Sequence, residues 1–194
     1  MFVALVLLIL NGCDFNQSSR TDAANPSVQT TRAPTPAETI VFDAYGLTND
    51  PTIAMEFEGN SDIFEARVLG IRPGHRTNPP AGQAIVFRPV DVVVTRVFLG
   101  DLRPGDRVAL AALGGTAADG TTMLYEDAWP DSTWRPGTEL FAFTEGPVDL
   151  GVGVTRTPNY LFVEQDGRAI DPFGEQPSKA LDAMRRQLTD ESAG

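Results

Sequence analysis

The sequence predicts a mainly β protein, a small β-barrel or sandwich with one C-terminal α-helix. From Thr39 onward, short segments with apolar residues at every second position recur along the chain, and such alternation is typical of half-buried strands. Glycine and proline pairs separate these segments as turn signals. Only one segment, 178–190, has apolar residues at helical spacing. Many short strands with few helices favour a barrel or a sandwich.

The first predicted strands are Thr39–Asp43 and Asp62–Ile71. In the second, apolar residues alternate with the charged Glu65 and Arg67, as expected of a strand with one buried face. The loop signals that follow include Pro79-Pro80.

Ala84–Leu99 is the most apolar strand candidate, with valines on both of its faces. A strand that is apolar on both sides is usually central in its sheet. Because proline cannot donate a ladder hydrogen bond, we expect a bulge or break at Pro89. A further strand, Asp106–Leu113, follows a turn at Pro104-Gly105.

The C-terminal half continues the pattern of strands and ends in the helix. Asp166-Gly167 suits a tight hairpin turn between the last two strands. The predicted strands are Thr122–Tyr125, Thr138–Thr144, Asn159–Gln165 and Arg168–Asp171.

The predicted helix has one apolar stripe, formed by Leu181, Met184 and Leu188. Ser178 is its expected N-cap. Asp182 is expected to pair with Arg186 four residues later, as such charge pairs stabilise helices.

Composition narrows the classes of partner. The chain has 194 residues and a formal net charge of −11, which favours one domain with tails and makes nucleic acid an unexpected partner. The same charge excludes attachment to a membrane through a basic patch. A single cysteine cannot close a disulfide within the chain.

That cysteine follows an apolar run, FVALVLLIL at residues 2–10. Leu10-Asn11-Gly12-Cys13 resembles the lipobox of bacterial lipoproteins. The resemblance implies that residues 1–12 are a signal peptide, and that Cys13 becomes a lipidated N-terminus bearing acyl chains such as palmitate. The protein would then be anchored on the extracytoplasmic face of the cell membrane. The alternative is a free cysteine in a short hydrophobic segment of a cytosolic protein.

Residues 13–38 are rich in Ser, Thr, Asn, Ala and Pro and contain few large apolar residues. Such a composition predicts a disordered tether. As a flexible coil it would hold the domain about 25–30 Å from its anchor. The folded domain is then expected to span residues 39–194.

Three pieces of the domain carry a second resemblance: DIFEARVLGI, VDVVVTRVFLGDLRPGDRVALAALGG and WRPGTELFAF. Over roughly residues 61–144 their spacing of apolar residues and glycines resembles netrin-type and metalloproteinase-inhibitor-like OB-fold domains. The resemblance implies an OB-like β-barrel. It does not extend to protease inhibition, since the disulfide cysteines of that family and the free cysteine amine of its inhibitors are absent.

Carboxylates and tryptophans gather in the segment YEDAWPDSTW: Glu126, Asp127, Trp129, Asp131 and Trp134. Carboxylates beside aromatic rings suit a sugar or a calcium ion, because hard cations favour oxygen ligands. The alternative is an acidic surface loop whose tryptophans cover one end of the barrel.

Other chemical signals are weak. His75 is the only histidine, so a zinc site lacks its usual ligands and a Ser-His-Asp system would have to use this one residue. Gly114-Gly115 and Gly151-x-Gly153 lack the rest of a nucleotide motif and are interpreted as turns or bulges. No metal and no cofactor is predicted.

The sequence therefore predicts a membrane-anchored extracytoplasmic lipoprotein with a β-barrel binding or interaction domain for a protein or glycan ligand. Two alternatives stay open. One is a cell-surface hydrolase that uses the carboxylates of the 126–131 loop, and the other is a structural part of an envelope complex.

Overall fold

The computed structural model describes residues 39–42, 49–77, 84–125, 128–174, 176 and 178–191. All of them belong to one compact unit, Pro36–Gly194. The predicted signal peptide, Cys13 and the tether to residue 38 lie outside the described residues, as do Glu126 and Asp127.

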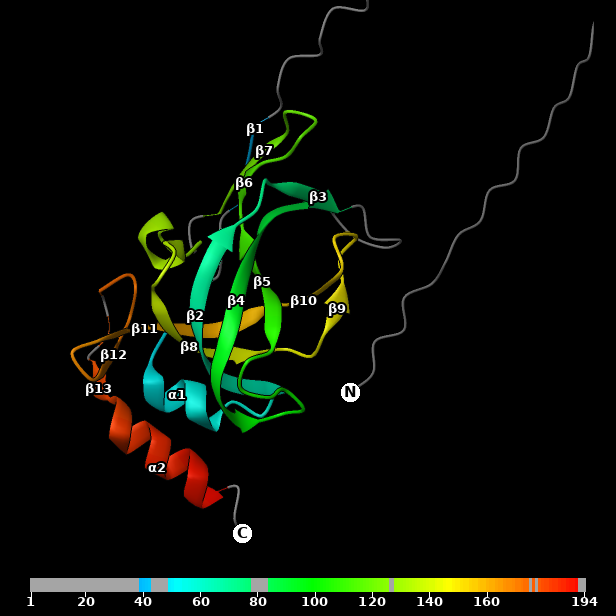
Figure 1. The fold of residues 1–194 in the computed structure, drawn as a ribbon. Helices are drawn as coiled ribbons and strands as arrows, with labels where there is room; N and C mark the ends of the chain where they lie inside the picture. Colours follow the sequence, from blue (N-terminus) through cyan, green and yellow to red (C-terminus); the bar gives the residue numbers. More distant parts are fainter. Residues whose placement is uncertain are drawn as a thin grey trace, which may run out of the picture. The chain divides into compact units, whose positions relative to one another are not determined.

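The described part is mainly β, as predicted, and its larger sheet holds ten strands. These are β2 (Asp62–Ile71), β3 (His75–Thr77), β4 (Ile85–Leu99), β5 (Arg107–Leu113), β8 (Glu139–Thr144), β9 (Val148–Asp149), β10 (Val154–Arg156), β11 (Pro158–Gln165), β12 (Arg168–Ile170) and β13 (Lys179–Ala180). Their order is β13–β12–β11–β8–β2–β4–β5–β10–β9, and β3 pairs with β4 outside this path (Figure 1). The sheet is mixed, because β5 and β10 pair in parallel.

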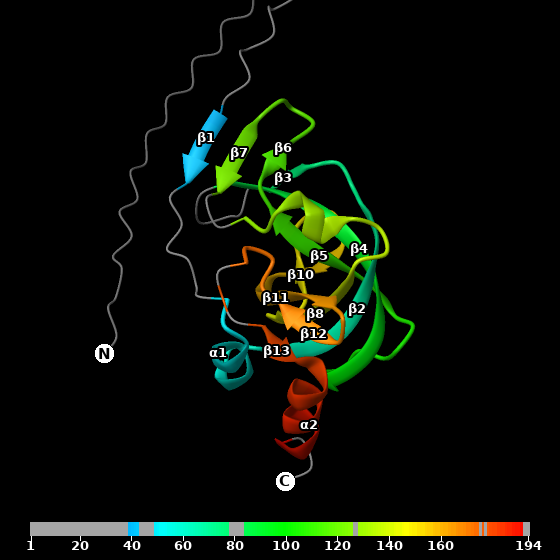
Figure 2. The same ribbon diagram turned by 90° about the vertical axis from the view of Figure 1, so that its left-hand side faces the viewer.

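A smaller sheet has the order β1–β7–β6, from β1 (Thr39–Phe42), β7 (Thr122–Tyr125) and β6 (Gly115–Thr116). In Figure 2 it lies at the end of the unit opposite to the two helices, α1 (Pro51–Glu56) and α2 (Leu181–Glu191). A short 3-10 helix, η1 (Asp131–Trp134), precedes β8.

The strand β4 runs without a break through Pro89, so the expected interruption there is wrong. The reason is that β4 changes partners on one edge at this position, while its other edge stays paired with β5. Residues 85–87 pair with β3, and residues 90–99 pair with β2. The missing donor of Pro89 falls between the two ladders, while its carbonyl accepts a hydrogen bond from the Arg72 amide at 2.8 Å.

The C-terminal helix is confirmed but begins later than predicted, at Leu181. Ser178 is not its N-cap. Its hydroxyl accepts a hydrogen bond from Arg168 Nε at 2.7 Å, and β13 separates it from the helix. Asp182 pairs with Arg185 at 3.2 Å, three residues along. The short helix α1 was not predicted; Asp50 caps its N-terminus.

Strands β8 and β11 are buried on both faces and separate two cores. The main core lies between these strands and β2, β4 and β5, and consists of Phe64, Ala66, Val68, Val90, Val92, Val94, Leu110, Ala112, Trp134, Leu140, Ala142 and Leu161. The helix-side core lies under α1 and α2, and consists of Ala54, Met55, Ile63, Phe141, Phe143, Tyr160, Phe162, Ala169, Leu181, Met184 and Leu188. The alternation along β8, with Leu140 and Ala142 in one core and Phe141 and Phe143 in the other, explains the layers.

Only Thr157 separates β10 from β11. Residues 154–165 therefore pass almost without interruption from a pairing with β5 to a pairing with β8. In Figure 1 this segment crosses behind β2 and β4.

The turn at Asp166-Gly167, between β11 and β12, has φ values of 52° and 72°. Positive φ values at both residues are what the predicted hairpin turn requires.

Candidate functional site

The predicted tryptophan site is brought together in part. Trp129 and Trp134 stand edge to face, with ring centroids 6.1 Å apart, and both pack on the main core. Trp134 is only 2% exposed. The Asp131 side chain is 81% exposed and pairs with Arg88 at 2.8 Å. A role of these residues in ligand binding stays a prediction. The packing of the two tryptophans on the main core fits the alternative, in which they cover the strands.

His75 lies in the short strand β3, where its ring meets Phe87 edge to face with the ring centroids 5.7 Å apart. Within the described ranges, the structure has no group of three or more His, Cys, Asp or Glu side chains arranged to hold a metal ion. None of the helices in the same ranges combines the length and apolar character that crossing a membrane requires.

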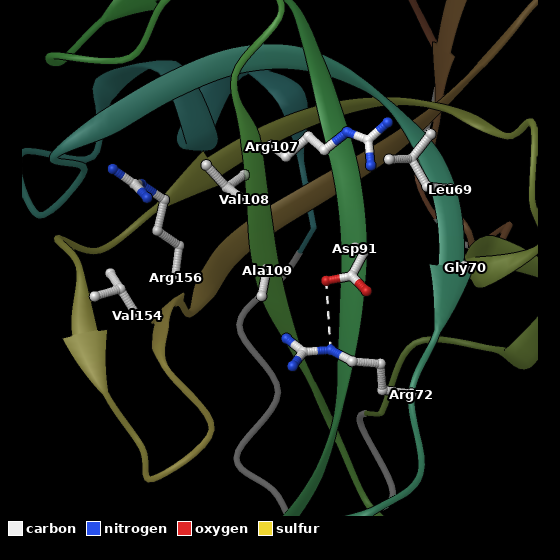
Figure 3. A pocket seen from close by; sticks show the side chains of 9 residues that line it. All are labelled: Leu69, Gly70, Arg72, Asp91, Arg107, Val108, Ala109, Val154 and Arg156. Carbon is white, nitrogen blue, oxygen red and sulfur yellow. Dashed lines mark ion pairs between the residues drawn. The ribbon is translucent and has the colours of Figure 1, made fainter.

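A cavity of about 600 Å³ lies elsewhere, on the strands β2, β4, β5 and β10 (Figure 3). Ligand pockets commonly have volumes of roughly 300–1,000 Å³. Its polar lining consists of Arg72, Asp91, Arg107 and Arg156, and its apolar lining of Leu69, Val108, Ala109 and Val154, with Gly70 between the two sets.

Strand register places these residues side by side. Gly70 is opposite Asp91, and Asp91 is opposite Ala109, across β2, β4 and β5. Arg107 precedes Ala109 by two positions on β5 and so points to the same face of the sheet. Figure 3 shows the Arg107 side chain extending across β4 toward Leu69.

Two of the three arginines are held by the protein itself. Arg156 Nε donates to Asp62 Oδ2 at 2.7 Å, and both side chains are almost fully buried. Arg72 Nε lies 3.3 Å from Asp91 Oδ1, and Arg72 Nη1 donates to the Val152 carbonyl at 3.5 Å. This last contact ties the turn between β9 and β10 to the cavity rim.

Arg107 differs from the other two, because it is exposed. Among the described residues, the salt bridges of the cavity are those of Arg72 with Asp91 and of Arg156 with Asp62. Three guanidinium groups thus meet two carboxylates, which leaves one positive charge on this face of a protein with a net charge of −11. Such a surplus attracts an anion.

Gly70 is an unusual residue for the interior of a strand. Its backbone does not need glycine, since its φ is not in the left-handed region, and an added Cβ would meet no atom within 4 Å. Glycine within a strand often marks a place where a ligand or another backbone approaches closely. Here the open space above Gly70 is the cavity.

Sequence reasoning missed this site. Arg72, Arg107 and Arg156 are far apart in the chain, and the parallel pairing of β5 with β10 brings the last of them to the cavity. The one local signal was Gly70 inside an otherwise regular strand pattern. No protein-family model, curated protein or solved structure matches the chain.

Proposed function

We propose that this protein is a membrane-anchored extracytoplasmic lipoprotein whose β domain binds a small ligand in the cavity over β2, β4, β5 and β10. The observation that carries the proposal is the cavity itself. Its volume, its mixed lining and its surplus cation support a ligand site.

We further propose that the domain is an OB-like barrel. The support is a ring of strand pairings: β2 with β4, β4 with β5, β5 with β10, and, past Thr157, β11 with β8 and β8 with β2. A five-stranded, partly open barrel is the OB architecture. In this arrangement β10 and β11 act as one bent strand.

The anchor proposal rests on the lipobox-like Leu10-Asn11-Gly12-Cys13 and on the apolar run before it. Lipid on Cys13 would keep the cavity near the membrane. At least two acyl chains give stable residence, whereas one gives marginal binding.

The ligand site is tested with the fluorescent probe anilinonaphthalene sulfonate on the full chain. Gly70→Phe places an aromatic ring in the cavity from a position with free space, so it should strongly reduce the fluorescence enhancement of the probe. Gly70→Ala is the matched control and should retain it. Equal enhancement in the wild type and Gly70→Phe would refute the cavity as the site.

The anchor is tested by cell fractionation and mass spectrometry. Wild-type protein should sediment with membranes and carry an acylated Cys13, whereas Cys13→Ala should enter the soluble fraction. A Cys13→Ala protein that stays with the membrane, or a wild-type chain with an unmodified thiol, contradicts the proposal.

A further inference from the structure

We infer that the cavity selects a singly charged anion, a carboxylate or a phosphate monoanion, attached to an apolar body. This inference rests on the proposed function, because it names the class of ligand for the same site. Three observations carry it. They are the guanidinium of Arg107, the apolar rim formed by Leu69 and Val154, and the open space above Gly70.

The charge of the ligand follows from the ion pairs. The guanidinium of Arg156 already meets the carboxylate of Asp62, and that of Arg72 meets Asp91. Among the described residues that line the cavity, only the charge of Arg107 is left over. One free guanidinium offers a planar fork of N–H donors that matches a carboxylate or phosphate. A ligand with several negative charges would find Asp91 repulsive and no second free cation.

The apolar part of the ligand follows from the rim. Leu69 is 38% exposed and Val154 is 59% exposed, although both line the cavity. They belong to β2 and β10, on opposite sides of the central strands. A ligand body between them would remove this apolar surface from water, which is favourable.

The glycine completes the arrangement. Because Gly70 has no side chain, a ligand can reach the backbone of β2 between Leu69 and Arg72. The neighbouring Asp91 carboxylate, already beside Arg72, gives that end of the cavity a fixed polar wall. The anionic group therefore lies at Arg107, and the apolar body lies over Gly70 and along Leu69 and Val154.

The experiment measures binding of three matched probes to the full chain by calorimetry. Octanoate and methyl octyl phosphate, a diester, each carry a single negative charge on the same apolar chain, and octanamide keeps the chain without the charge. We expect octanamide to bind about tenfold more weakly than octanoate, because a charge-assisted hydrogen bond of about 1.5 kcal/mol is lost. Arg107→Gln should weaken octanoate by a similar factor and leave octanamide unchanged.

Arg103→Gln is the control for net charge. Arg103 is exposed, lies four residues before Arg107 and does not line the cavity. It should change octanoate affinity less than twofold. Vesicles of phosphatidylglycerol distinguish the source of the anion. Binding to vesicles that Arg107→Gln removes indicates a membrane lipid, and binding to monomeric methyl octyl phosphate alone indicates a free metabolite.

The outcomes separate this inference from the proposed function. If octanamide binds as tightly as octanoate, or if Arg107→Gln loses no more affinity than Arg103→Gln, the anionic class is wrong. In that case, loss of both probes in Gly70→Phe would still support the cavity as the ligand site. No binding of any probe to the wild type, or equal binding to Gly70→Phe, overturns both.

Discussion

Two glycines, Gly70 and Gly100, differ in whether the structure requires glycine at their positions. Gly70 lies within β2 and has free space around its Cα. Gly100 follows β4 with φ of +99°, and a Cβ there would stand 2.1 Å from Asp62 Oδ1. Conformation and packing both require glycine at position 100, and neither requires it at position 70.

We therefore predict opposite effects of the same substitution on the free energy of unfolding, measured in urea. Gly70→Ala should stabilise the protein by about 0.5–1 kcal/mol, since glycine in a strand interior is less favourable than alanine. Gly100→Ala should destabilise it by at least about 1–2 kcal/mol, the cost of a left-handed backbone for an L-residue. Effects of the same sign would contradict this reading.

The buried pair of Asp62 and Arg156 gives a second prediction. Asp62→Ala leaves the Arg156 guanidinium buried without its carboxylate, and breaking a buried pair in this way costs about 3–5 kcal/mol. Asp91→Ala breaks the half-exposed pair with Arg72 and should cost about 0–1 kcal/mol. Chemical denaturation of both variants tests the difference, and equal losses would show that burial does not set the strength of these pairs.

Two carboxyl groups should give opposite pH dependences. Burial raises the pKa of Glu139, more than Arg67 lowers it. The Thr121 backbone amide, followed by the Thr121 hydroxyl, lowers the pKa of Asp119. A raised pKa in the folded state favours folding at low pH, and this contribution is lost as the pH rises through it. A lowered pKa favours folding above the unfolded value, and this contribution is lost as the pH falls.

Accordingly, Glu139→Gln should raise the melting temperature at neutral pH, and the difference from the wild type should vanish below about pH 4, where the carboxyl is protonated in both states. Asp119→Asn should lower the melting temperature at neutral pH and converge with the wild type in acid. Thermal melts at a series of pH values from neutral to acid test both predicted changes in melting temperature. A stabilising effect of Glu139→Gln that grows in acid would be inconsistent with burial as the cause.

At the scale of elements, alternation in the sequence located most of the long strands. Asp62–Ile71 was predicted with the bounds that β2 has, because its outward positions are charged and its turns are clear. The short strands β3, β9 and β10 were missed, since two or three residues carry no periodic signal. The start of α2 was misplaced because Ser178 looks like a cap in sequence, whereas tertiary pairing of β13 with β12 uses that segment.

The apolar stripe of α2 was correctly identified, and it yields a further prediction. Met184 is fully buried in the helix-side core, so Met184→Ala should cost about 2–5 kcal/mol. Arg186 lies on the exposed side of the helix, and Arg186→Ala should stay within about 0.5 kcal/mol of the wild type. Urea unfolding measures both values. A small loss for Met184→Ala would mean that α2 does not hold this core together.

At the scale of the whole domain, the order of strands leaves β10 with a role that hydrogen exchange can test. If the proposed barrel is closed through β10 and β11, β10 can open only when the barrel opens. The amides of residues 154–165 should then be as protected as those of β2 and β4, near the global stability. Mass spectrometry of proteolytic peptides measures this. Fast exchange confined to residues 154–156 would instead indicate a loose sheet edge.

The cavity shows why a site of this kind escapes sequence analysis. An overall charge of −11 argued against nucleic acid as a partner, yet a local excess of one guanidinium at Arg107 depends on which partners Arg72 and Arg156 find in the fold. Those pairings join residues separated by long stretches of chain. Composition averages over the surface, whereas a binding site depends on a few positions.

Both tryptophans of the chain belong to or pack on the main core. The helix-side core contains Tyr160 and phenylalanines but no tryptophan. Tryptophan fluorescence therefore reports on the main core and not on the helix-side core. Hydrogen exchange of the α2 amides would follow the helix-side core. If the two signals change at different denaturant concentrations, the layers on the two sides of β8 and β11 come apart in separate steps.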